Sequence, residues 1–187
     1  MNLLVRKSTM YDAKQIAPLI YEAIGDIAVR LTGAREDKDI LAGLEELVRS
    51  EDNRHSYLHT YVACEEEKIL GMVVLYDGKT GKDLDGLLMK KLQKKYGSSY
   101  HIDVEAHEDE YYIDTICVAP DARGLGIGTM LLRFAEEQAR KFGYTKLALN
   151  VETSKIKARR LYEREGFVVT EPWEIIGEPF HHMVKGL

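Results

Sequence analysis

The chain has 187 residues, of which 45% are hydrophobic and 30% are charged. This length suits one domain with its own core, and no repeat, low-complexity segment or interdomain linker is present. Acidic residues outnumber basic ones, 31 to 26, giving a formal net charge of −5. The chain therefore lacks the basic excess that is typical of a nucleic-acid-binding protein.

We expect a cytoplasmic protein, because no secretion signal is recognised and the two cysteines fit a reducing compartment. Residues 1–5 are too short for a secretion signal, because Arg6 and Lys7 follow at once. No apolar stretch reaches membrane-spanning length, so no membrane partner is expected. Cys64 and Cys117 lie in apolar runs without metal-ligand spacing, and we expect both to be free buried thiols.

The N-terminal part alternates between strand and helix patterns. In chain order we expect a strand at 2–7, a helix capped by Ser8 or Thr9, a helix opened by Asp37 or Asp39, and strands at 57–65 and 68–76. The last two strands form a hairpin with a turn at Glu65–Lys68. Gly71 indicates a bulge or a close backbone approach.

The segment 77–110 is less regular. Asp77, Gly78 and Gly81 predict a loop, followed by a helix that Gly97 ends. The lysines of this helix are expected to face solvent rather than bind an anion. Residues 101–109 alternate polar and apolar, which predicts a half-buried strand with an acidic, histidine-bearing face.

Two interpretations of that acidic face remain open. It either protects a sheet edge from aggregation, which we favour, or attracts a cationic substrate. A metal site is a more remote alternative, because residues two apart diverge along a strand and form no tetrahedral set. That set would consist of His101, Asp103, Glu105 and His107.

Residues 111–129 contain the most informative pattern in the chain. Tyr111–Val118 is typical of a buried strand, and Pro120 ends it. Arg123 and three glycines follow, and then a helix is expected from Thr129 to Phe142. A strand, a glycine loop and a helix start together favour phosphate binding, because free backbone N–H groups and the helix dipole point at the anion.

The remaining part of the chain is predicted to contain a strand, a helix and two further strands. In order we expect a strand at 146–151, a helix at about 154–165 that Gly166 ends, and two strands at 167–171 and 180–185. The connection between the last two strands is predicted to be a loop that contains Pro172 and Pro179.

The spacing of the glycine loop is not that of a dinucleotide fingerprint or a P-loop. Arg123-x-x-Gly126-x-Gly128 after a strand resembles the acyl-CoA pyrophosphate loop of the GNAT N-acetyltransferase superfamily. The run LYEREGF at 161–167 is similar to the second GNAT signature, and HHMVK at 181–185 resembles its final strand.

The resemblance covers essentially the whole chain apart from about 77–109. It implies one α/β domain over residues 1–187, with a layered GNAT fold and a mixed central sheet of about six or seven strands flanked by helices. Residues 77–109 would then be an insertion that adds a helix and a strand before the central strand.

The resemblance further implies that acetyl-CoA is the co-substrate. In the family the central strand separates from the next one at a bulge, and its backbone pairs with the pantetheine arm. Carried onto this chain, the cofactor-binding residues are Ile116, Cys117, Val118, Arg123, Gly124, Gly126, Ile127, Gly128, Thr129 and Lys155. Lys155 departs from the asparagine common in the family, so its role is left open between a CoA phosphate and solvent.

The catalytic expectations concern proton transfer. By resemblance, Tyr162 lies beside the CoA sulfur and acts as general acid. Asp114 lies at a plausible position on the central strand and is a candidate general base, since a carboxylate in a strand expected to be buried needs a partner. A structural hydrogen bond explains Asp114 equally well, Glu110 is a nearby alternative, and ordered water is another.

These features together predict an N-acetyltransferase that moves acetyl from acetyl-CoA to a primary amine of a small molecule or peptide by direct attack in a ternary complex. The alternative is a non-catalytic module that binds or senses acyl-CoA. No metal cofactor is expected, and the oligomeric state stays open between a monomer and a homodimer.

Overall fold

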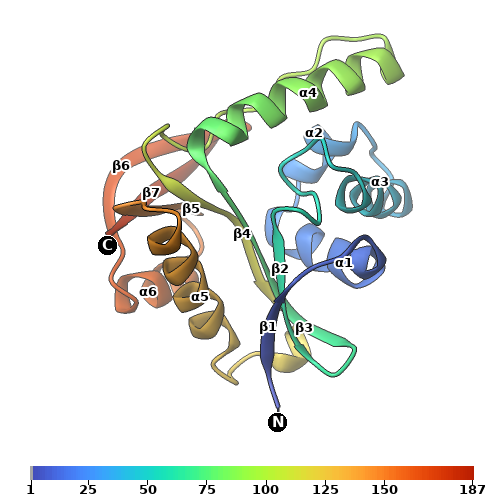
Figure 1. Ribbon diagram of the computed structural model, residues 1–187. Helices are drawn as coiled ribbons and strands as arrows, with labels where there is room; N and C mark the ends of the chain where they lie inside the picture. Colours follow the sequence, from blue (N-terminus) through green and yellow to red (C-terminus); the bar gives the residue numbers. More distant parts are fainter. Residues whose placement is uncertain (1) are drawn as a thin grey trace.

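The computed structural model describes residues 2–187 and contains one mixed sheet between two layers of helices (Figure 1). Its strands are β1 Leu4–Lys7, β2 Thr60–Glu65, β3 Lys68–Asp77, β4 Tyr111–Val118, β5 Lys146–Glu152, β6 Val168–Ile175 and β7 Glu178–Gly186. The order is β1-β2-β3-β4-β5-β7-β6, and only the β4–β5 pair is parallel. The predicted α/β fold and mixed sheet are confirmed.

The helices cover opposite faces of the sheet. They are α1 Ala13–Ile24, α2 Ile27–Thr32, α3 Asp37–Arg49, α4 Gly78–Tyr96, α5 Ile127–Lys141 and α6 Ile156–Arg164. In Figure 1 the group α1–α3 lies on one side and α5 and α6 on the other. Strand β3 is buried from Ile69 to Tyr76 because helices cover both its faces. Among residues 2–187, no helix combines the length and apolar character needed to cross a bilayer.

Both cysteines and Gly71 match their predictions. Cys64 and Cys117 are free and buried. Gly71 lies beside a register shift between β2 and β3, and a Cβ there would come within 3.0 Å of the Cys117 carbonyl oxygen and Ile127 Cγ2. Both expectations for this glycine, a bulge and a close approach, are therefore met.

The start of α4 differs from the prediction of a loop. Asp77 caps the helix, because its side chain accepts a hydrogen bond from the Thr80 N–H at 2.8 Å. The helix therefore begins at Gly78. Gly81 serves close packing, since a Cβ there would lie 2.5 Å from the Tyr76 ring.

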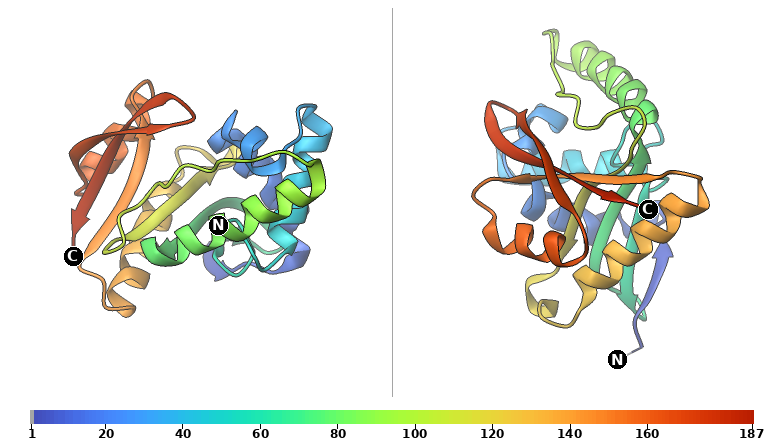
Figure 2. Two further views of the ribbon diagram at one scale, coloured as in Figure 1. Left: turned by 90° about the horizontal axis from the view of Figure 1, so that it is seen from above. Right: turned by 90° about the vertical axis from the view of Figure 1, so that its left-hand side faces the viewer.

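The strand predicted at 101–109 is wrong, because residues 97–110 form a loop. Exposure in this segment does not follow the predicted alternation, in which the polar residues are the exposed ones: Glu105 is 7% exposed, whereas Val104 is 50% exposed. Side-chain bonds replace the sheet ladder, because the Trp173 indole donates to the Val104 carbonyl at 3.0 Å and Asp103 accepts from the Ile176 N–H at 2.8 Å. Figure 2 shows this loop running from the end of α4 across one end of the sheet, past β6 and β7.

The last two strands are longer than predicted. They form a hairpin closed by Ile176 and Gly177, which both have positive φ, as a type I′ turn requires. Pro172 lies inside β6. Because proline cannot donate a ladder hydrogen bond, it is confined to positions such as edge strands, and β6 is an edge strand of the sheet.

Candidate active site

The site begins where β4 and β5 separate. The two strands pair only from Tyr111 to Ile113, opposite Leu147 to Leu149. Asp114 is an extra residue in the β3–β4 register, because Val74 faces Thr115 while Leu75 faces Ile113. Such a bulge bends a strand and increases its twist. Beyond this fork, one edge of β4 has no strand partner.

Backbone directions along that edge follow from one hydrogen bond. The Ala119 N–H donates to the Leu70 carbonyl in β3 at 2.9 Å. Because backbone groups alternate along an extended strand, those of Cys117 face β3 and those of Ile116 and Val118 face the gap. The Arg123 Nε bond to the Val118 carbonyl, 3.3 Å long, agrees with this.

A cavity of about 1000 Å³ occupies the gap. All the site residues predicted from sequence line it: Asp114, Ile116, Cys117, Val118, Arg123, Gly124, Gly126, Ile127, Gly128, Thr129, Lys155 and Tyr162. Cys117 contributes its side chain only, and burial raises the pKa of its thiol, which disfavours a nucleophilic role.

The glycine loop delivers free backbone donors to this cavity. Gly124 and Gly126 have φ of 81° and 80°, a region that other residues rarely adopt. Helix α5 then begins at Ile127, two residues earlier than predicted. The first intrahelical bond is donated by Met130 to the Gly126 carbonyl, so the N–H groups of residues 127–129 are unpaired within the helix.

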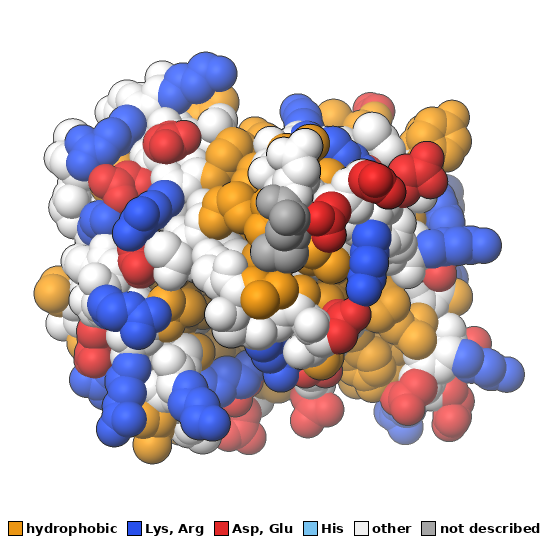
Figure 3. Space-filling model, turned by 90° about the horizontal axis from the view of Figure 1, so that it is seen from below, with side chains coloured by type: hydrophobic (Ala, Val, Ile, Leu, Met, Phe, Trp, Pro, Cys, Tyr) orange, Lys and Arg blue, Asp and Glu red, His pale blue; other side chains and the backbone are white. Residues whose placement is uncertain are grey.

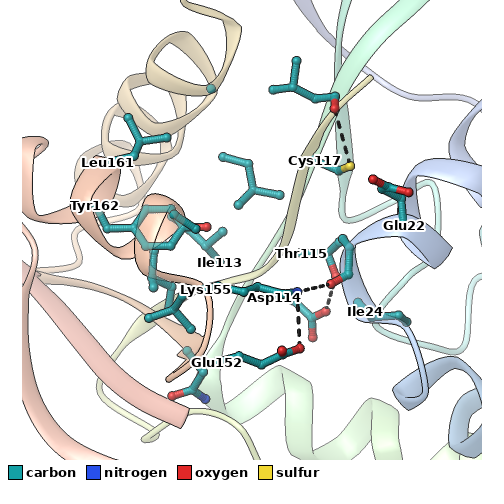
Figure 4. A pocket seen from close by; sticks show the side chains of 18 of the residues that line it. Glu22, Ile24, Ile113, Asp114, Thr115, Cys117, Glu152, Lys155, Leu161 and Tyr162 are labelled. Atoms are coloured by element: carbon teal, nitrogen blue, oxygen red, sulfur yellow. Dashed lines mark hydrogen bonds and ion pairs between the residues drawn. The ribbon is translucent and has the colours of Figure 1, made fainter. Parts of the chain in front are cut away.

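Two basic side chains cross the cavity mouth. Arg123 pairs with Glu22 of α1 at 2.8 Å. Lys155 Nζ lies 3.3 Å from Glu152 and donates to the Ala23 carbonyl at 3.0 Å. Figure 4 shows Glu22, Glu152 and Lys155 with Tyr162 around the pocket. On the underside of the molecule, Lys and Arg side chains gather over the half that carries α5 and α6 (Figure 3).

Tyr162 lies on α6 with its hydroxyl directed into the pocket (Figure 4). The ring is 9% exposed and packs edge-on against Phe167 at 6.2 Å. Its hydroxyl makes no hydrogen bond to any group in residues 2–187. Burial, with a smaller effect of Cys117, raises the pKa of Tyr162 to about 12. The phenol therefore stays protonated and can donate.

A buried ion cluster closes the other part of the cavity. The Arg54 guanidinium, 2% exposed, lies 3.0 Å from Glu105 and 3.3 Å from both Asp85 and Asp114. Asp114 also contacts His55 Nε2 at 3.0 Å and accepts a hydrogen bond from Tyr76. Three carboxylates thus surround one arginine.

The two carboxylates of this cluster that line the cavity differ in proton affinity. Burial alone would raise the pKa of Asp114, but the charge of Arg54 and the contacts from His55 and Tyr76 hold it well below its usual range. Burial raises the pKa of Glu105 to about 7 despite Arg54. Asp114 is a weak base, whereas Glu105 changes charge near neutral pH.

Sequence reasoning missed Arg54 and His55. The strand predicted from residue 57 begins only at Thr60, and residues 51–59 form turns. Nothing in the local pattern marks these residues, because their partners lie in distant parts of the chain. The alternation of residues 101–109 predicts Glu105 on the acidic face of a half-buried strand, whereas the structure buries its side chain.

The metal set considered from sequence does not converge. His101 pairs with Asp103 at 3.0 Å, Glu105 binds Arg54, and His107 pairs with Glu171 at 2.6 Å. A different trio, His107, Glu171 and His182, has ligand atoms within 4.8 Å of one another. The His182 ring bonds Asn150 and Glu110. Glu110, which the sequence offered as an alternative general base, does not line the cavity.

Comparisons with known proteins agree with this geometry. An N-acetyltransferase from Staphylococcus aureus Mu50 has 26% sequence identity and a TM-score of 0.83, over 97% of this chain and 99% of that one. A crystal structure described as an acetyltransferase has 29% identity and a TM-score of 0.80, over 98% of both chains.

The sequence relatives match over shorter segments. "GCN5-related N-acetyltransferase 6, chloroplastic" from Arabidopsis thaliana is 40% identical over 60 residues, 32% of this chain. The matched segments span only 21 to 46% of the length of the curated relatives. The model of the Acetyltransferase (GNAT) family matches residues 26–167, and the chain therefore belongs to that family.

Proposed function

We propose that this protein is an acetyl-CoA-dependent N-acetyltransferase acting on a primary amine. The observation that carries the proposal is the cavity along the unpaired edge of β4, which has both the 123–129 loop and Tyr162 in its walls. Transfer from a thioester to an amine needs a held CoA, a neutral amine, donors for the oxyanion and a proton for the thiolate.

The cofactor roles follow from the chemistry of the lining. The free N–H groups of residues 127–129 and the α5 dipole suit a pyrophosphate, and Arg123 and Lys155 add positive charge. The gap-facing backbone of Ile116 and Val118 suits the amides of a pantetheine arm. We expect Cys117 to contribute only van der Waals contact.

The two catalytic candidates, Tyr162 and Asp114, take different roles. Tyr162 would donate to the leaving thiolate, because its hydroxyl is protonated and has no competing partner in residues 2–187. Asp114 would hold Arg54, His55 and Tyr76 in place, since a carboxylate of such low pKa accepts protons poorly. This is the structural alternative weighed for Asp114 from the sequence.

The rival proposal is an acyl-CoA-binding module without transfer activity. Free thiol release from acetyl-CoA separates the two proposals when it is measured with a panel of amines, alongside calorimetry with CoA. Amine-dependent release supports the enzyme. CoA binding without release from any amine supports the module, and no CoA binding contradicts both.

We further propose the cytoplasm as the location, because two free buried thiols suit a reducing compartment.

A further inference from the structure

The charges of the cavity lining change sign along its length. The loop around Arg123 and helix α6 supply basic residues, including Lys157 and Arg164. Asp114 and Glu105 lie at the fork between β4 and β5. Val118 lies four residues after Asp114 along β4, which is roughly 13 Å at about 3.3 Å per strand residue. The cavity thus offers a basic end for phosphates and an acidic end.

Glu105 is fixed at the fork by bonds to both strands. Its carboxylate accepts from the Tyr112 hydroxyl of β4 at 3.0 Å. Its carbonyl accepts from the Asn150 side chain of β5 at 2.8 Å, and Asn150 is the first β5 residue beyond the paired segment. The loop that carries Glu105 therefore closes the acidic end.

The cluster at this end lacks positive charge. Arg54 faces Asp85, Glu105 and Asp114, so one cation opposes three carboxylates. The His55 Nδ1 atom is also buried and has no hydrogen-bond partner within residues 2–187. Buried charges that are not balanced and polar atoms without partners are costly, so a bound cation would stabilise this arrangement.

We propose that this acidic end is the acceptor subsite, that it binds a primary ammonium group, and that Glu105 removes the proton before attack. This rests on the acetyltransferase function proposed above. Apolar side chains, among them Ile27, Ile175 and Phe180, line the same cavity. The structure therefore favours an amine with an apolar substituent and no carboxylate beside the nitrogen.

The proton balance assigns one step to each group. Glu105 takes one proton from the ammonium, and the amine lone pair then forms the C–N bond at the thioester carbonyl. As the C–S bond breaks, Tyr162 donates its proton to the sulfur and receives one from the nitrogen. The products are the amide and free CoA, and the proton on Glu105 passes to solvent.

Glu105 suits this role better than its neighbours. A base is most effective when its pKa lies near the working pH, and the pKa of Glu105 is about 7. The charged or titratable groups that face it are Arg54, Tyr76, Asp85, Tyr112 and Asp114. Asp114 is held ionised by the same arginine.

The test is the pH profile of kcat/KM for 2-phenylethylamine in the wild type and in Glu105→Gln. The wild type should rise to a plateau above about pH 7 and fall near the amine pKa of about 10. The variant should lose about 100-fold at pH 7.5. It should instead rise tenfold per pH unit toward pH 10, because only the neutral amine would then react.

The control is Glu108→Gln, an exposed carboxylate of the same loop outside the cavity lining. It should keep the wild-type profile. CoA affinity by calorimetry should be the same in all three proteins, which shows that the variants are folded. An unchanged profile in Glu105→Gln would overturn the proposal, and a profile altered only in His55→Asn would assign the base to His55 instead.

Acceptor charge is tested with phenylalaninamide and phenylalanine, which differ by one carboxylate. The amide should be the better substrate by at least tenfold, and equal use of both would overturn the subsite. Calorimetric titration of 2-phenylethylamine into the CoA complex keeps the two proposals distinguishable. Binding that Glu105→Gln weakens, without any transfer, would refute the enzyme but support the subsite; neither binding nor transfer would refute the subsite.

Discussion

At the scale of single residues, Tyr162 has the environment of a proton donor. Its ring is buried, its hydroxyl reaches the cavity, and its pKa near 12 keeps it protonated at any working pH. A thiolate is a weaker base than the phenolate of such a tyrosine, so Tyr162 would donate to the departing sulfur in the same step in which it recovers a proton from the reacting nitrogen.

Tyr162→Phe should therefore lower kcat by about 100-fold while CoA affinity changes less than about twofold. The ring and its packing on Phe167 remain, and only the hydroxyl is lost. Turnover and calorimetry measure the two effects. Tyr144→Phe, outside the cavity lining, is the matched control. Unchanged kcat in Tyr162→Phe would reject the acid role.

A second residue-scale prediction concerns Glu22, which holds Arg123 at 2.8 Å. Both side chains are half exposed, so the pair is worth less than about 1 kcal/mol. A phosphate must compete with this carboxylate for the arginine. Glu22→Gln should tighten CoA binding about two- to fivefold, measured by calorimetry at low and high salt.

The control for that variant is Glu137→Gln, which makes the same change in net charge on exposed α5 away from the cavity. Its CoA affinity should match the wild type. Equal tightening in both variants would mean that long-range charge, rather than the Glu22–Arg123 pair, controls binding.

At the scale of elements, hydrogen bonds at the start of α4 and at the far side of the loop after it hold both segments in place. Asp77 accepts from the Thr80 N–H at 2.8 Å and from its hydroxyl at 2.7 Å. These bonds fix the first turn of the helix that carries Asp85. The loop is fixed at its far side by Trp173 and Asp103.

Asp77→Ala should lower the free energy of unfolding by about 1 kcal/mol, because the first turn loses its cap. Urea titration at pH 7 measures the change as a lower midpoint with an unchanged slope. Asp83→Ala, an exposed position in the same helix, should have little effect. Equal losses in both variants would indicate a general charge effect instead of capping.

At the scale of the whole molecule, the buried cluster links stability to pH. The pKa of Glu105 is about 7 in the folded protein against an ordinary value of 4.5. Between these values the folded state binds more protons than the unfolded state, so stability falls as pH rises. Asp114 has a lowered pKa, so its contribution is present above 3.8 and is lost only at lower pH.

The stability of the wild type relative to Glu105→Gln should thus fall by about 3 kcal/mol between pH 4.5 and 7.5. Urea unfolding at several pH values in this range measures it. Other groups titrate there, including His59, whose pKa burial lowers, and His107, whose pKa the bond to Glu171 raises. They are common to both proteins and cancel, so parallel stability curves would contradict the prediction.

The sequence by itself determined the central unit of strand, glycine loop and helix, together with the residues of that unit that line one wall of the cavity. These features are local: positive φ at Gly124 and Gly126, the start of α5 and the burial of β4 depend mainly on neighbours in the chain. The start of α4 differs from the prediction because the Asp77 cap, rather than apolar spacing, decides where that helix begins.

Only the tertiary structure decided what lies opposite that unit. Arg54, Asp85, Glu105 and Asp114 come from a turn, a helix, a loop and a strand, and no local pattern brings them together. The alternation of residues 101–109 predicted a strand, but a buried arginine that needs a carboxylate partner outweighs the preference of so short a segment for a sheet. The acidic end of the cavity exists because of that long-range pairing.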